Sequence, residues 1–148
     1  MLSPDKLMRS LLAVPLFVGV SARHLKALML SAERVTFADG ERLIVEGQLG
    51  EAAFVVVEGS VVMTRGHYDL ACSAPLPPGT LAGELAMLIE TTHEATVVAS
   101  GPVKALMFKR STLLLLMAED PALAEHFVER FQRRLADMAV RLREFDAY

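Results

Sequence analysis

The chain has 148 residues, of which 53% are hydrophobic, and a formal net charge of −3 at neutral pH. A length in this range predicts a single domain, residues 1–148, that can bury a hydrophobic core, and the lack of a basic excess argues against direct nucleic-acid binding. The only cysteine, Cys72, excludes an internal disulfide framework and a cysteine-only metal site.

The sequence predicts no membrane span. No apolar run approaches the roughly 18 residues that a spanning helix needs, and the longest run, Leu113–Ala118, predicts a short buried helix. The N-terminal residues carry charges and lack the apolar stretch and cleavage site of a signal peptide. We therefore expect a cytoplasmic protein.

Residues 1–31 predict two short N-terminal helices. Leu7 and Leu11 recur at helical spacing, and Pro15 interrupts the pattern. Ser21 then has a side chain suited to cap a second helix.

Residues 32–109 predict a β-sandwich. Asp39-Gly40 and Glu58-Gly59, each between apolar or β-branched runs, predict the turns of two hairpins. Gly101-Pro102 predicts another turn, between the last two strands. A further strand is expected at Tyr68–Ser73, because a cluster of prolines and a glycine follows it and ends the extended run.

Residues 110–148 predict C-terminal helices. Asp120 followed by Pro121 is suited to the start of a long amphipathic helix. The apolar stripe of this helix recurs every three or four residues and consists of Leu123, Phe127, Phe131, Leu135, Met138, Leu142 and Phe145.

The most informative stretch of the sequence is residues 78–88, PGTLAGELAML, followed by residues 91–96, TTHEAT. Together with Pro15-Leu16-Phe17 and a series of spaced glycines, it resembles the cyclic nucleotide-binding domain family, which includes the catabolite activator proteins, the protein kinase A regulatory subunits and the cyclic-nucleotide-gated channels. The resemblance covers about residues 15–117. The glycines are Gly40, Gly47, Gly50 and Gly59, which we interpret as turn residues that need a positive φ.

The resemblance implies a fold that is mainly β with flanking helices, namely a double-stranded β-helix (jelly-roll) sandwich with N-terminal helices and a long C-terminal helix. A short helix at 83–89 would contact the phosphate of a ligand. The turn before such a helix leaves N–H groups without intrahelical partners, and Gly83 lets a ligand approach the backbone closely. The Glu84 carboxylate can accept a hydrogen bond from a sugar hydroxyl.

By resemblance, Glu84 binds the ribose hydroxyl and backbone N–H groups near Gly83 bind the cyclic phosphate of cyclic AMP or cyclic GMP. Members of the family usually place a proline and then an arginine before two small residues. When Ala95-Thr96 are aligned with that pattern, Thr92 occupies the proline position and His93 the arginine position. The expected ligand-binding residues are Gly83, Glu84, Leu85, Ala86, Thr92, His93, Ala95 and Thr96.

Histidine at this position changes the chemistry of phosphate binding. A guanidinium is always charged and presents a planar fork, whereas a histidine is largely neutral at pH 7. Glu90 and Glu94 flank His93 in sequence, and in a dry pocket each would oppose a bound anion. The loss of a charge-assisted contact costs about 2 to 5 kcal/mol.

Three functions remain open from the sequence. A cyclic nucleotide binds, either with His93 protonated or with Arg65 as the cation; the pocket takes a different small ligand; or a degenerate sandwich serves as a dimerising protein-interaction module. The sequence does not choose between adenine and guanine. The four histidines lack metal-ligand spacing, so we expect neither a metal site nor an enzyme.

In part of the family the long C-terminal helix pairs two subunits and can close over the ligand. We therefore expect a homodimer through this helix, and a lid near Leu123 and Phe127. We expect no DNA-binding domain in this sequence, so the signal would either reach an unidentified effector protein or only change the dimer.

Overall fold

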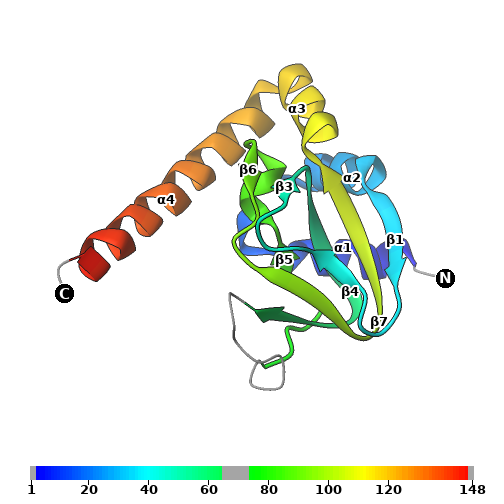
Figure 1. Ribbon diagram of the computed structural model, residues 1–148. Helices are drawn as coiled ribbons and strands as arrows, with labels where there is room; N and C mark the ends of the chain where they lie inside the picture. Colours follow the sequence, from blue (N-terminus) through cyan, green and yellow to red (C-terminus); the bar gives the residue numbers. More distant parts are fainter. Residues whose placement is uncertain (1–2, 65–73, 147–148) are drawn as a thin grey trace.

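The structure is a computed structural model that describes residues 3–64 and 74–146. It is mainly β with flanking helices, which confirms the expected fold class (Figure 1). In chain order the elements are α1 (Pro4–Leu12), the 3₁₀ helix η1 (Pro15–Phe17), α2 (Ala22–Ser31), β1 (Glu33–Phe37), β2 (Arg42–Ile44), β3 (Leu49–Gly50), β4 (Ala52–Thr64), β5 (Leu81–Ala82), the 3₁₀ helix η3 (Glu84–Met87), β6 (Thr91–Thr92), β7 (Thr96–Lys109), α3 (Arg110–Glu119) and α4 (Pro121–Asp146). The expected strand Tyr68–Ser73, and with it Arg65 and Cys72, lies outside the described residues.

Both N-terminal helices begin at serine caps. The Ser3 Oγ accepts a hydrogen bond from the N–H of Lys6 at 3.2 Å. The Ser21 Oγ accepts one from the N–H of His24 at 3.3 Å, as the sequence predicts. Each cap satisfies an N–H that has no partner inside the helix.

The long strand β7 organises the main sheet. On one side it pairs with β1 and, further along, with β2, and on the other side with β4. The prediction of a hairpin at Asp39-Gly40 is therefore wrong, because β1 and β2 pair with β7 rather than with each other. The turn between them is tied to the same neighbour, since the Asp39 Oδ1 accepts a hydrogen bond from the Gly101 N–H at 2.8 Å.

Two further expected turns lie inside continuous strands. Glu58-Gly59 is an irregularity within β4, where the register with β7 shifts on both sides of Glu58. Gly101-Pro102 lies within β7. The prediction of a hairpin at Glu58-Gly59 and the prediction of a turn between two strands at Gly101-Pro102 are therefore both wrong. A Cβ on Gly59 would lie 2.3 Å from the Pro102 carbonyl oxygen, which shows that the two irregular sites face each other. Turn residues in neighbouring strands thus bend the pair without reversing the chain.

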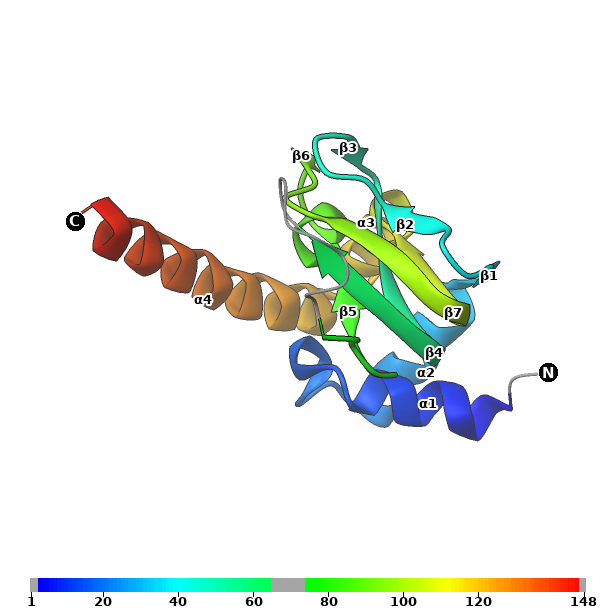
Figure 2. The same cartoon turned by 60° about the horizontal axis from the view of Figure 1, so that its bottom comes forward.

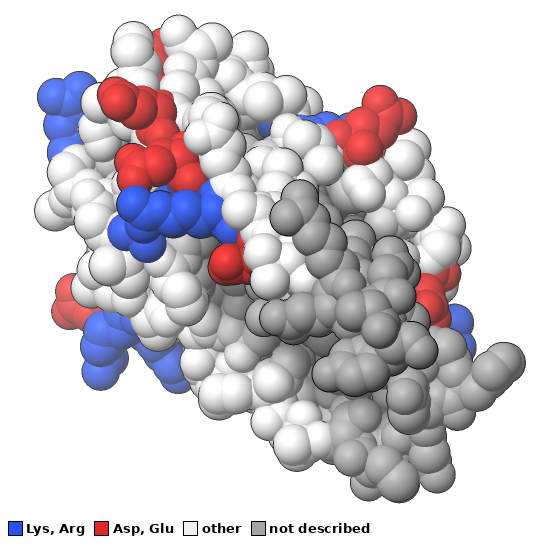
Figure 3. All heavy atoms as spheres, turned by 90° about the vertical axis from the view of Figure 1, so that its left-hand side faces the viewer, with Lys and Arg blue, Asp and Glu red and all other residues white. Residues whose placement is uncertain are grey.

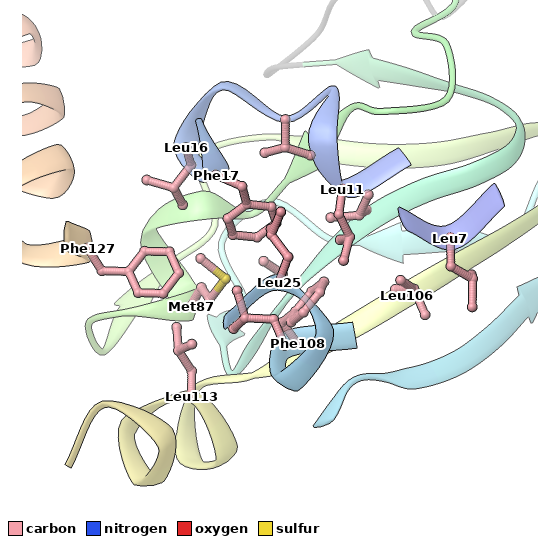
Figure 4. Close-up of a cluster of buried hydrophobic side chains, with 14 of the residues drawn as sticks. Leu7, Leu11, Leu16, Phe17, Leu25, Met87, Leu106, Phe108, Leu113 and Phe127 are labelled. Atoms are coloured by element: carbon pink, nitrogen blue, oxygen red, sulfur yellow. The ribbon is translucent and has the colours of Figure 1, made fainter. Parts of the chain in front are cut away.

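The sheet carries hydrophobic side chains on both faces. One face packs with β1 and β2 residues inside the sandwich, around Val56, Val61 and Ala105. The other face packs against the helices, and Figure 4 shows its cluster, in which Phe17, Phe127 and Met87 point toward one another. The Phe17 ring centroid lies 5.9 Å from that of Phe127 and 5.9 Å from that of Phe108. Helices from both ends of the chain are therefore joined through one core.

Helix α3 is helical as expected but is not buried as a whole. Leu113 is 2% exposed, whereas Leu114 and Leu115 are 46% and 68% exposed. The apolar run predicted burial wrongly, because a helix rotates successive side chains to different faces and only one face of α3 meets the core.

Asp120 caps helix α4 as predicted, and the helix then leaves the body of the molecule (Figure 2). The Asp120 Oδ1 accepts a hydrogen bond from the Leu123 N–H at 3.3 Å, and the same carboxylate pairs with His24 of α2. Along the predicted stripe, Phe127 and Phe131 are buried but Leu135 is 43% exposed. The side chains of the last three stripe positions, Met138, Leu142 and Phe145, lie outside the described part. Among the described helices, none combines the length and the apolar character needed to cross a bilayer.

Candidate ligand-binding pocket

A hollow of about 140 Å³ opens between η3, the segment around β6 and the inner face of the sheet. Seven of the eight residues expected to bind ligand line it: Gly83, Glu84, Leu85, Ala86, Thr92, His93 and Ala95. The two segments singled out by sequence are thus brought to one cavity. Apolar side chains that sequence analysis did not nominate complete the wall, namely Ile44, Met63, Leu81 and Val97.

Gly83 forms the turn into η3 and needs to be a glycine. Its φ is +80°, and a Cβ there would lie 2.9 Å from the Ile44 Cδ1 and 3.2 Å from the Ala52 carbonyl oxygen. Its carbonyl accepts the hydrogen bond from the Ala86 N–H at 3.0 Å, which starts the short helix. The helix spans Glu84–Met87 and is of the 3₁₀ type, shorter than the expected 83–89. Individual N–H groups, rather than a sizeable helix dipole, are therefore the available anion donors.

His93 lies at the junction of the pocket walls. Its N–H donates to the Gln48 carbonyl at 2.9 Å, and its own carbonyl accepts from the Gly47 N–H at 2.9 Å. The ring packs over two glycines, because its Cε1 lies 2.9 Å from where a Cβ on Gly50 would be and 3.4 Å from where one on Gly83 would be. Burial lowers the pKa of His93 below its ordinary value, because a charged imidazolium loses hydration there.

Gly50 differs from the other glycines of the series. Gly40, Gly47 and Gly59 have positive φ, which confirms them as residues in a left-handed conformation. Gly50 does not; it lies in β3, and a Cβ there would lie 2.5 Å from the Ala86 Cβ. The expectation of a positive φ at Gly50 is therefore wrong. The lack of a side chain at this position instead allows β3 to approach η3 closely.

Thr96 and the flanking glutamates occupy different environments. Thr96 is not part of the described lining; its Oγ1 accepts a hydrogen bond from the Glu46 N–H at 3.0 Å and so fixes the loop after β2. Glu94 lines the pocket, while Glu90 is exposed and lies outside that lining. Leu123 and Phe127, the expected lid, are buried in the core beneath the helices rather than in the pocket wall.

Arg110, the first residue of α3, was missed by sequence analysis. Its Nη1 donates hydrogen bonds to the carbonyls of Gly50 at 2.9 Å, Ile89 at 3.1 Å and Ala86 at 3.3 Å. Its position at the start of a helix could have indicated a structural role, because a cation in the first turn is disfavoured by the helix dipole and needs another partner.

Within residues 3–64 and 74–146, no cluster of three or more His, Cys, Asp or Glu side chains could bind a metal ion. On the face shown in Figure 3, basic and acidic side chains are interspersed over the described atoms.

Comparison with known proteins gives consistent results. A sequence model described as "Cyclic nucleotide-binding domain" matches residues 34–120. The "Cyclic AMP receptor protein" of Thermus thermophilus is 29% identical over 136 residues, which cover 89% of this chain. The chain spans 63% of the length of that curated relative.

Two solved structures show the same architecture. The N-terminal domain of a transcriptional regulator from Streptomyces coelicolor A3(2) has a TM-score of 0.75 and 29% identity, covering 87% of this chain and 94% of that chain. The catabolite activator protein of Thermus thermophilus has a TM-score of 0.71 and 27% identity, covering 89% of this chain and 63% of that chain.

Proposed function

This chain belongs to the cyclic nucleotide-binding domain family, and we propose on that basis that it is a regulatory ligand-sensing module that binds cyclic AMP or cyclic GMP. The observation that carries the proposal is that residues 83–86 of the η3 turn and residues 92–95 of the following segment line one cavity. The relative named for a cyclic nucleotide, the Cyclic AMP receptor protein, supports the same ligand class.

In the proposed complex each wall of the pocket contacts a different part of the nucleotide. Backbone N–H groups at the start of η3 donate to the cyclic phosphate, and the Glu84 carboxylate accepts from the ribose hydroxyl. His93 contacts the phosphate from the opposite segment. Apolar side chains such as Met63 and Val97 line the remaining wall, where a base can pack.

His93 makes the proposed binding dependent on pH. Burial lowers its pKa in the free protein, and a bound phosphate raises it again, because the anion stabilises the imidazolium. Ligand binding is therefore coupled to proton uptake, and affinity falls as pH rises. An arginine at this position would carry no such dependence.

Titration calorimetry with cyclic AMP and cyclic GMP at pH 6 and pH 8 tests the proposal, since imidazole titrates between these values. We expect saturable binding that is tighter at pH 6. His93→Gln serves as the control and should bind weakly with no difference between the two pH values. Equal wild-type affinity at the two pH values would contradict a role of His93 in phosphate binding. The absence of a binding signal at both pH values would exclude a cyclic nucleotide ligand.

We also propose that α4 pairs two copies of the chain and that a separate effector protein receives the signal. Val128, Leu135 and Val140 are half exposed on α4, which supports an intersubunit contact. The same observation favours the second candidate function, a dimerising interaction module without a small ligand. A stable dimer that binds neither nucleotide would support that candidate. The absence of catalysis and a cytoplasmic location stay predictions.

A further inference from the structure

Three carbonyl groups around the pocket share one donor. The Arg110 Nη1 donates to the Gly50 carbonyl in β3, to the Ala86 carbonyl in η3 and to the Ile89 carbonyl just after η3. These carbonyls belong to segments about 35 to 40 residues apart in the chain, which no covalent turn fixes relative to each other. A guanidinium is always charged, so these contacts persist over the whole physiological pH range.

The two segments that Arg110 joins form the surfaces on which His93 packs. A Cβ on Gly50 would lie 2.5 Å from the Ala86 Cβ and 2.9 Å from the His93 Cε1. Any separation of β3 from η3 would therefore open the space beneath the imidazole. Arg110 lies behind these walls and does not itself line the described pocket.

The location of Arg110 in its own helix indicates that these contacts outweigh a local cost. It is the first residue of α3, where a positive charge opposes the helix dipole. The same charge lies beside the last carbonyls of η3, where a cation is favourable. Its own N–H donates to the Glu51 carbonyl at 2.9 Å, which fixes the start of α3 next to β3.

We propose that Arg110 is a positioning residue. It holds η3, β3 and the start of α3 in fixed positions relative to one another, and thereby sets the geometry of the pocket around His93. Its consequence for nucleotide affinity rests on the proposed function, whereas its effect on the pocket walls does not.

The first test needs no ligand. In the NMR spectrum of the free protein, the ring signal of His93 and the methyl signal of Ala86 report on the walls, and the ring signal of His126 reports on α4, where its Nε2 lies 3.0 Å from the Leu16 carbonyl oxygen. Arg110→Met keeps the aliphatic stem and removes the donors. We expect it to displace the His93 and Ala86 signals and to leave the His126 signal in place.

Lys109→Met is the matched control, because it makes the same charge change at the preceding residue. Lys109 pairs with Glu33 of β1 at 3.0 Å, away from the pocket walls. The control should leave the His93 and Ala86 signals unchanged. Wild-type signals in Arg110→Met, or equal displacements in both variants, would overturn the proposal.

Arg110→Lys covers the case in which Arg110→Met does not fold. A compact ammonium cannot reproduce the planar fork, so we expect displacements of His93 and Ala86 in the same direction but smaller, again without a change at His126. Coincidence of the His93 and Ala86 signals with the wild type would overturn a role for the guanidinium.

The second test measures cyclic AMP binding by calorimetry. We expect Arg110→Met to weaken binding about tenfold relative to Lys109→Met, because the donors at η3 and His93 no longer converge. Equal affinities would overturn the proposed effect on the ligand. If the wild type itself does not bind, the proposed function fails, and the NMR comparison still decides the role of Arg110.

Discussion

His93 combines an unusual position with a tightly packed environment. By the proposed alignment with the family pattern it takes the position of an arginine, and its ring packs over Gly50 and Gly83, where it is partly removed from water. A neutral imidazole tolerates this burial better than an imidazolium does. The residue therefore links three properties of the protein: packing of the pocket walls, protonation and the proposed affinity for an anion.

Replacing His93 with arginine should strengthen nucleotide binding. A guanidinium restores a permanent charge and a fork suited to phosphate oxygens, so we expect at least about a tenfold gain in affinity for cyclic AMP, equivalent to about 1.4 kcal/mol. Calorimetry should also show that the difference between pH 6 and pH 8 disappears. An unchanged affinity would mean that residue 93 does not contact the phosphate.

Replacing His93 with glutamine should make stability less dependent on pH. The folded-state pKa of His93 is lowered, so below about pH 6.5 the unfolded chain binds more protons and the wild type loses stability as pH falls. Above that pH both states are neutral and the contribution of His93 vanishes. Urea unfolding at pH 7 and pH 5 should show a smaller loss for His93→Gln, and an equal loss would contradict the assignment.

Gly50→Ala tests the close approach of β3 and η3. The added methyl would overlap the Ala86 side chain, so we expect a destabilisation of about 1 to 3 kcal/mol and weaker ligand binding. Gly40→Ala is the control, because a Cβ there meets nothing within 4 Å and only the positive φ opposes it. Denaturant unfolding and calorimetry should show that the control loses stability without losing affinity relative to the wild type.

At the scale of elements, the contacts between α4 and the domain that the described side chains show come from its first turns. Phe127 packs against Phe17 of η1, while His126 and Arg130 bind the Leu16 and Val18 carbonyls of the same segment, at 3.0 and 2.8 Å. The next stripe position, Leu135, is 43% exposed. One helix thus contains a docked part and a projecting part.

Phe127→Ala should detach α4 from the helical core. The side chain is fully buried, so its removal is expected to cost about 3 to 5 kcal/mol. Leu115→Ala is the control, and because Leu115 is 68% exposed on α3 it should cost less than about 0.5 kcal/mol. Thermal unfolding of both variants distinguishes them, and similar midpoints would show that α4 is not docked as described.

At the scale of the whole molecule, the projecting part of α4 is suited to pair with a second copy. A helix that leaves its own domain with apolar residues exposed gains stability when those residues are buried by a partner, and a two-fold arrangement is the commonest solution. Pairing along α4 would place two pockets on either side of one shared element.

Leu135→Lys should convert the expected dimer to a monomer, because it places a charge in the proposed contact. Leu115→Lys is the control, since Leu115 is more exposed and lies on α3. Light scattering should give a dimer for the wild type and the control and a monomer for Leu135→Lys. A monomeric wild type would exclude pairing through α4.

Sequence alone determined those features that depend on interactions between residues close together in the chain. Helix caps at Ser21 and Asp120 depend on side chains that reach an N–H a few residues away, and both were predicted. The segments around Gly83 and His93 were identified as site segments from their order in the chain, although their contact with a ligand stays a proposal.

Only the tertiary structure decided which distant segments meet. The turn signals at Glu58-Gly59 and Gly101-Pro102 could not reveal that they face each other as bends within two paired strands, because strand pairing is set by side chains far apart in the sequence. For the same reason, the position of Arg110 at a helix start could indicate that it needs a partner but not that it would lie behind the pocket. Its role depends on bringing β3, η3 and α3 within hydrogen-bond distance, and packing of the whole domain does that.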